Sequence, residues 1–173
     1  MILSNKDIKD YLESGKLAVS PLSEDTIREN GVDLRIGNEI SRFLMSTKEI
    51  EIGNSAALET IYKKEQVTGP FVIHPNERVL IKIKERIRLP NDLVGFSNIR
   101  STFARLGVSI PPTIVDAGFE GDLTILLIGG AVPIKVEPGT RFLHLVFGKT
   151  NSEVTVPYRG KYYSSSGVTG AKV

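Results

Sequence analysis

The residues with the most evident chemistry stand in the middle of the chain, where Arg100, Ser101 and Thr102 follow one another. The residues after them suit one or two helical turns, and Gly107 is typical of the position at which a helix ends. The start of a helix offers backbone N–H groups that have no helical partner, and these groups bind anions. With a guanidinium and two hydroxyls beside them, they predict a phosphate-binding site.

Two carboxylates can also take part in chemistry. Asp116 follows an apolar run and precedes a glycine-containing segment, so it either forms a turn or is positioned as a base. Asp33 alternates with Val32 and Leu34 in a predicted strand. Together with Arg35, it either belongs to a solvated strand face or points into a site.

Composition limits the classes of protein to consider. The 173 residues most simply form one domain, and the net charge of +2 gives no reason to expect nucleic-acid binding. The absence of cysteine excludes disulfides and the cysteine-liganded zinc of the zinc deaminases. No apolar run has membrane-spanning length and the N-terminus lacks a signal-peptide pattern, so we expect no membrane association and a cytoplasmic location.

Strands must position these residues, because most of the chain is predicted to form short strands separated by Gly and Pro turns. One helix is expected in the first fifteen residues, with Ser4 as its N-cap. An apolar strand over residues 123–128 is expected to turn at Gly129 and Gly130 and to return as a hairpin. The pattern predicts an all-β barrel or jelly roll with a short N-terminal helix.

Four segments resemble signature motifs of one superfamily, which contains the trimeric dUTP diphosphatases and the zinc-free dCTP deaminases. The resemblance implies a dUTPase-like β domain over residues 1–157 and a flexible tail over residues 158–173 that closes over a nucleotide. It also implies a homotrimer whose sites are shared between subunits. The segments are Gly-Val-Asp-Leu at 31–34, Arg-Ser-Thr-Phe-Ala-Arg-Leu-Gly at 100–107, Val-Asp-Ala-Gly-Phe-x-Gly at 115–121 and Pro-Gly-x-Arg-Phe-x-x-Leu at 138–145.

One position separates the two reactions of this superfamily. Its deaminases carry a glutamate ten residues beyond the aspartate of the third motif, and that position is Leu126 here. A leucine cannot transfer a proton, and Glu120 and Asp122 are expected to face solvent from a turn. The resemblance therefore favours a dUTP diphosphatase that produces dUMP and diphosphate. The alternatives are a dCTP deaminase, a bifunctional dCTP deaminase/dUTPase, and a nucleotide-binding regulator without catalysis.

The resemblance also implies roles for individual residues. Asp116 would activate the water that attacks the α-phosphorus of dUTP, with Mg²⁺ as the cofactor, and Asp33 would contact the metal through water or bind the sugar end. His144 is either a phosphate ligand or a histidine packed within an apolar strand. The implied phosphate ligands are Arg100, Ser101, Thr102, Arg105, His144, Lys161 and Gly167. The implied nucleoside contacts are Phe119, whose ring would pack on deoxyribose, with Ile125, Leu126, Leu127 and Tyr162.

Overall fold

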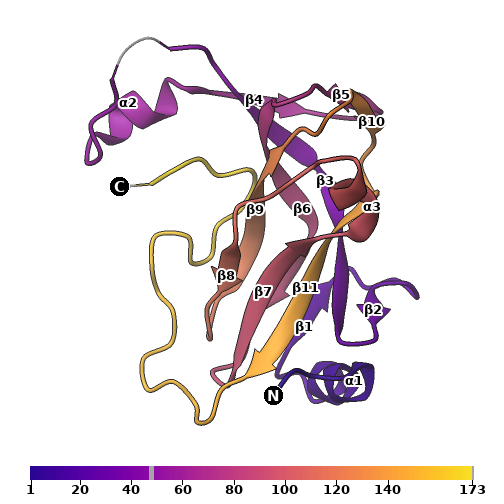
Figure 1. The fold of residues 1–173 in the computed structure, drawn as a ribbon. Helices are drawn as coiled ribbons and strands as arrows, with labels where there is room; N and C mark the ends of the chain where they lie inside the picture. Colours follow the sequence, from indigo (N-terminus) through magenta and orange to yellow (C-terminus); the bar gives the residue numbers. More distant parts are fainter. Residues whose placement is uncertain (47–48, 173) are drawn as a thin grey trace.

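The computed structural model describes residues 1–46 and 49–172, and its main feature is one curved antiparallel sheet with a helix near the N-terminus (Figure 1). The main path of the sheet runs β1-β6-β3-β11-β7-β8; β2 and β4 also pair with β3, and β9 pairs with β6. A separate pair is formed by β5 and β10. The all-β fold with a short N-terminal helix is therefore confirmed.

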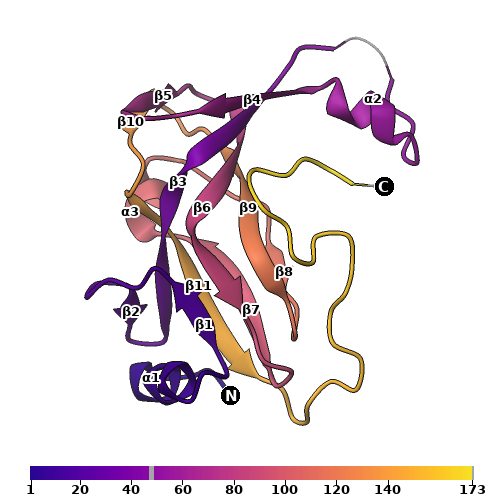
Figure 2. The ribbon, with the colours of Figure 1, turned by 180° about the vertical axis from the view of Figure 1, so that it is seen from behind.

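The strands and helices have the following bounds. The strands are β1 (Ala18–Ser20), β2 (Ile27–Arg28), β3 (Gly31–Phe43), β4 (Tyr62–Gln66), β5 (Phe71–Ile73), β6 (Arg78–Arg88), β7 (Leu93–Ile99), β8 (Thr113–Val115), β9 (Glu120–Ile128), β10 (Ile134–Val136) and β11 (Arg141–Lys149). The helices are α1 (Asn5–Glu13), α2 (Ser55–Glu59) and α3 (Ser101–Arg105). The view from behind shows α1 at one end of the sheet and α2 on an arm that stands away from it (Figure 2).

Strand β3 is long enough to pair with different neighbours along its length. Its first part pairs with β11 and its second part with β6, with a shift in register past Ile36. Val32, Leu34 and Ile36 are fully buried in the core. Because side chains alternate along a strand, Asp33 points to the other side of the sheet, and so does His144, its direct partner on β11. We call this side the outer face.

Helix α1 begins as the sequence predicts. The Ser4 hydroxyl accepts a hydrogen bond from the Asp7 backbone N–H, and the Asp7 carboxylate accepts one from the Ser4 N–H, which completes a capping box. Ile8 is fully buried and fixes the helix to the core.

The predicted hairpin of residues 123–136 is wrong, because β10 pairs with β5 and not with β9. Gly129 and Gly130 do not form a hairpin turn; they let other backbone segments pack closely against this part of the chain. A Cβ on Gly129 would lie 2.0 Å from the His74 carbonyl oxygen, and one on Gly130 would lie 2.0 Å from that of Leu106. Only glycine permits both contacts.

The chain after β11 runs beside β8 and β9 as a long segment without helix or strand (Figure 1, yellow). We call residues 158–172 the tail. Its backbone N–H groups donate to the sheet at several points: Tyr158 to Ala117 O at 2.9 Å, and Ser164 to Glu120 O at 2.7 Å. Val168 is buried. The division into a domain and a flexible tail remains a prediction.

Within residues 1–46 and 49–172, no helix is both long enough and apolar enough to cross a membrane.

Candidate active site

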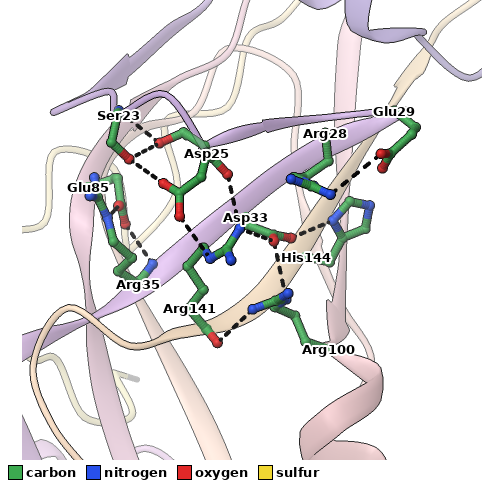
Figure 3. A network of polar contacts seen from close by, with 11 residues as sticks. Ser23, Asp25, Arg28, Glu29, Asp33, Arg35, Glu85, Arg100, Arg141 and His144 are labelled. Carbon is green, nitrogen blue, oxygen red and sulfur yellow. Dashed lines mark hydrogen bonds and ion pairs between the residues drawn. The ribbon is translucent and has the colours of Figure 1, made fainter.

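Asp33 lies at the centre of a polar cluster on the outer face (Figure 3). Its Oδ2 lies 3.1 Å from Arg100 Nε and 3.4 Å from Arg141 Nη1, and its Oδ1 lies 2.9 Å from His144 Nδ1. An ionised carboxylate only accepts hydrogen bonds, so Nδ1 of His144 carries a proton in this contact. The side chain of Asp33 is only 3% exposed, which excludes the solvated-face interpretation.

Arg35, the second polar residue of this strand, has a different role. Its Nε lies 2.6 Å from Glu85 Oε1, and its backbone N–H donates to Glu85 Oε2 at 3.0 Å. Glu85 is fully buried on β6. Arg35 therefore joins β3 to β6 and supports the sheet beside the Asp33 cluster.

Arg100 connects the Asp33 cluster to helix α3. It is the N-cap residue of α3 with an extended backbone, and its own N–H donates to Phe142 O at 2.9 Å. Its guanidinium donates to Arg141 O at 3.3 Å, so β11 and Asp33 together fix its direction. Gly107 ends this part of the chain with a φ of +78°, as predicted.

A surface hollow of about 290 Å³ opens over this cluster. It brings together four of the predicted site residues: Asp33, Arg100, Ser101 and His144. Thr102 and Arg105 lie farther along α3, exposed, and are not among the lining residues. The structure thus brings part of the predicted phosphate ligands together in one hollow, and phosphate binding there remains a prediction.

A second and larger cavity, of about 510 Å³, lies between β8, β9 and the tail. Five predicted residues line it: Asp116, Phe119, Ile125, Leu126 and Tyr162. The side chain of Leu127 is fully buried on the opposite side of β9 and takes no part. The cavity is mostly apolar with a few polar groups, which suits a nucleoside.

Asp116 directly follows β8 and is exposed to this cavity. Its main-chain carbonyl accepts the turn hydrogen bond, from Phe119 N at 3.1 Å. Asp116 is thus the first residue of a β-turn, a position at which aspartate is common. No described residue donates a hydrogen bond to the Asp116 carboxylate, and its role as the catalytic base remains a prediction.

The expected position of Asp122 is wrong, because its side chain is only 12% exposed and lines the cavity. Lys82 Nζ lies 3.4 Å from its Oδ2, and Gly167 N–H donates to the same oxygen at 3.1 Å. Asp122, Thr124 and Leu126 alternate along β9, so all three face the cavity. Counting back from Leu126 in steps of two residues reaches Thr124 and then Asp122, which would have placed Asp122 on the cavity side of the strand.

The tail closes the cavity from one side through Tyr158, Tyr162, Ser165, Thr169 and the residues after it. Tyr158, Ser165 and Thr169 are lining residues that sequence reasoning missed, since the tail has no periodic pattern. Lys161 is exposed and is not a lining residue. The Gly167 N–H, predicted to bind phosphate, is held by Asp122 in this structure.

The hollow and the cavity open on different sides of the sheet. Within the described part of the chain, no residue lines both the hollow and the cavity. The two views agree: the tail lies along one side of the sheet, and β2 and α3 lie on the other (Figures 1 and 2). One copy of the chain therefore presents the cavity and the hollow as two separate pockets.

The predicted contact of Asp33 with a metal through water, or with the sugar end, remains a prediction. Both carboxylate oxygens of Asp33 are taken by cationic or proton-donating side chains, and the two guanidiniums repel a further cation. Among residues 1–46 and 49–172, no three His, Cys, Asp or Glu side chains are grouped so that they could hold a metal ion.

Similar proteins carry both names suggested by the motifs. A probable deoxyuridine 5'-triphosphate nucleotidohydrolase of Sulfolobus islandicus rod-shaped virus 1 is 55% identical over 172 residues, which cover 99% of this chain and 99% of the viral protein. A dCTP deaminase of Acidianus ambivalens is 53% identical over 169 residues, which cover 98% of this chain and 96% of the deaminase.

A solved structure confirms the fold. The 2'-deoxycytidine 5'-triphosphate deaminase of Agrobacterium tumefaciens superposes with a TM-score of 0.69 at 21% identity, over 84% of this chain and 46% of that chain. The model of the dCTP deaminase-like family matches residues 2–150, and with the two close relatives it shows that this chain belongs to that family.

Proposed function

We propose that this protein is a dUTP diphosphatase that hydrolyses dUTP to dUMP and diphosphate. The observation that carries the proposal is Leu126, which lines the nucleoside cavity at the position where the deaminases place a glutamate. Deamination needs a group that transfers protons beside the base, and a leucine cannot supply one. The viral relative named a probable dUTP nucleotidohydrolase supports this choice.

Asp116 is the proposed general base. It accepts a proton from the water that it positions, and the water oxygen forms a bond to the α-phosphorus. The bond from the α-phosphorus to the oxygen bridging to the β-phosphate breaks, and diphosphate leaves with that oxygen. Arg100 and Ser101 oppose the negative charge on the phosphates, since electrostatic positioning is the main contribution in phosphoryl transfer.

The metal ion enters as part of the substrate complex. Mg²⁺ bound to the triphosphate would spread its negative charge. Asp33, whose oxygens are taken, instead fixes Arg100 and His144 for phosphate binding.

Because the hollow and the cavity face different sides of one chain, we propose that a complete site forms between two copies. One copy would supply Asp116, Phe119 and Leu126, and its neighbour would supply Arg100, Ser101 and His144. A cyclic trimer would repeat this contact three times, since identical subunits related by rotation make identical contacts.

A dCTP deaminase, alone or combined with dUTP hydrolysis, is the second candidate. The relative from Acidianus ambivalens is named a dCTP deaminase at 53% identity. Asp122 is a second carboxylate in the cavity. It already contacts Lys82, Arg86 and the Gly167 N–H of the tail.

A product assay decides between these functions. The protein receives Mg²⁺ with either dUTP or dCTP, and chromatography resolves the nucleotides while diphosphate is measured separately. We expect dUMP and diphosphate from dUTP, no uracil nucleotide from dCTP, and loss of activity in Asp116→Asn. The matched control Asp122→Asn changes the other carboxylate of the cavity and should retain hydrolysis.

Each other outcome has a defined meaning. Uracil nucleotides formed from dCTP and lost in Asp122→Asn would show a deaminase that uses Asp122 in place of the missing glutamate. Tight binding of dUTP without any product would indicate a regulator. Either result would overturn the proposed function.

A further inference from the structure

Tyr158, the first residue of the tail, packs against the ring that the resemblance assigns to the sugar. The centroids of the Phe119 and Tyr158 rings are 5.9 Å apart, and their planes are inclined by 46°. Both residues line the nucleoside cavity, and Phe119 is almost fully buried. The Phe119 ring is therefore packed against a residue, Tyr158, that lies outside all four signature motifs.

The turn that carries Asp116 and Phe119 is held between two segments. On one side, Gly118 N–H donates to Pro90 O at 3.2 Å. On the other side, Tyr158 N–H donates to Ala117 O at 2.9 Å, and Arg159 Nη1 donates to Gly118 O at 3.1 Å. The start of the tail thus fixes the backbone of the turn as well as the ring of Phe119.

Gly118 makes this close approach possible. Its φ is +82°, and a Cβ built on it would lie 2.5 Å from Pro157 Cβ. Gly160 likewise permits a close contact, because a Cβ built on it would lie 2.7 Å from the Tyr158 ring. Two glycines therefore leave room for the chain to wrap around the Tyr158 ring.

The hydroxyl of Tyr158 makes a second connection. It accepts a hydrogen bond from the Tyr162 backbone N–H at 3.2 Å, and Tyr162 lines the cavity from the tail. Tyr158 therefore contacts Phe119 through its ring and the tail residue Tyr162 through its hydroxyl.

We propose that Tyr158 is a positioning residue that selects deoxyribose over ribose. Its ring holds Phe119 against the position of the sugar C2', so that a 2'-hydroxyl has no room, and its hydroxyl holds Tyr162 in place over the nucleoside. The proposal rests on the proposed function insofar as the cavity receives a 2'-deoxynucleotide, but not on which base is bound.

The test compares kcat/KM for dUTP and UTP in the wild type, Tyr158→Leu and Tyr158→Phe. Tyr158→Leu removes the aromatic contact and should reduce the preference for dUTP by about five- to tenfold, the factor that one aromatic pair is worth. Tyr158→Phe keeps the ring and should keep the preference, while KM rises for both nucleotides because Tyr162 loses its anchor. Val156→Ala is the control and should change neither quantity, because Val156 lies just before the tail, is 83% exposed and does not line the cavity.

A double-mutant cycle shows whether Tyr158 acts through Phe119. In the Phe119→Leu background, Tyr158→Leu should cause no further loss of the dUTP preference, because the shared contact is already gone. An unchanged preference in Tyr158→Leu, or a preference lost equally in Tyr158→Phe, would overturn the proposal. Circular dichroism checks that Tyr158→Leu folds. If it does not fold, the preference and KM measured for Tyr158→Phe alone test the proposal.

A binding measurement separates this proposal from the proposed function. Dissociation constants for dCTP and CTP, and for dUTP and UTP, are measured in the Asp116→Asn background, where no turnover is expected. If the wild type proves to be a deaminase and Tyr158→Leu still reduces the preference for dCTP over CTP, the proposed function fails and the role of Tyr158 holds. If neither deoxynucleotide is preferred over its ribonucleotide, the role of Tyr158 fails.

Discussion

Two aspartates show how the same residue type takes opposite roles in this protein. Asp33 is buried and contacts Arg100, Arg141 and His144, so its carboxylate holds these side chains in place. Asp116 is exposed to a cavity, and no described residue donates a hydrogen bond to its carboxylate. A carboxylate in the second situation can still accept a proton from a substrate water.

Replacement of Asp116 by asparagine keeps the shape of the side chain but removes the base. We expect kcat for dUTP hydrolysis to fall by about 10²–10⁴-fold, the usual contribution of a general base, with KM little changed. Steady-state kinetics measure both constants. A kcat within a factor of about three of the wild type would assign the base to another residue.

Replacement of Asp33 by asparagine should lower the free energy of unfolding by roughly 2–4 kcal/mol, because Arg100 loses its counter-charge and Arg141 loses the buried one of its two. The expected loss of stability is smaller than for a fully buried ion pair, because the side chains of Arg100 and Arg141 are 31% and 28% exposed. Urea unfolding measures the change.

Asp25 provides the matched control for Asp33. It also pairs with Arg141, at 3.1 Å, but its side chain is 52% exposed. Asp25→Asn should lower the free energy of unfolding far less than Asp33→Asn, because exposed ion pairs contribute little to stability. Equal losses in the two variants would contradict a special role for the buried position.

Asp116, Arg100 and Ser101 could be singled out in advance, because their residue types and immediate neighbours carry local signals. Asp122 was missed for a physical reason. Its neighbour Gly121 indicates a turn, whereas strand β9 already begins at Glu120 and carries Asp122 into the cavity wall. Backbone pairing with β6, which no local pattern reveals, overrides the turn signal there.

At the scale of elements, locally stabilised pieces were predictable and long-range pairings were not. Helix α1 and the end of α3 follow from caps that lie within a few residues. The pairing of β10 with β5 joins segments about sixty residues apart, and the Gly129-Gly130 signal there reflects packing against distant carbonyls. Short-range turn rules cannot distinguish these two uses of glycine.

Helix α1 also carries a pH-dependent contact with the sheet. The Tyr11 hydroxyl donates to Asp92 Oδ2 at 2.6 Å, and burial, followed by this hydrogen bond, raises the pKa of Tyr11 to about 12. The raised pKa stabilises the fold fully below pH 10, the pKa of an unfolded tyrosine, and this stabilisation is lost as the pH rises towards 12.

The measurement is the free energy of unfolding between pH 9 and 12 for the wild type and Tyr11→Phe. We expect the wild type to lose stability more steeply than the variant above about pH 10, because only the wild type carries this ionisable group. Parallel curves would show that the Tyr11 contact does not contribute to the alkaline loss.

At the scale of the whole molecule, the two halves of the proposed site face apart. Arg100 lines the hollow and Asp116 lines the cavity, and no described residue lines both. Assembly, and not a change within one chain, is therefore the simplest way to complete the site.

Complementation between inactive variants tests this arrangement. Asp116→Asn and Arg100→Gln are each expected to be inactive, but co-expressed with different tags and purified as mixed assemblies they should regain activity. Random assortment in a cyclic assembly leaves about one site in four with both wild-type residues. Mixed assemblies that form and stay inactive would place both residues of each site on the same chain.

The position of β11 has a consequence for biosynthesis. It is the last strand in the sequence, yet it lies in the middle of the sheet between β3 and β7. A nascent chain on the ribosome therefore carries two partial sheets with unpaired inner edges until residues 141–149 emerge. Such edges pair readily with other chains, so the cell must protect this polypeptide until synthesis is nearly complete.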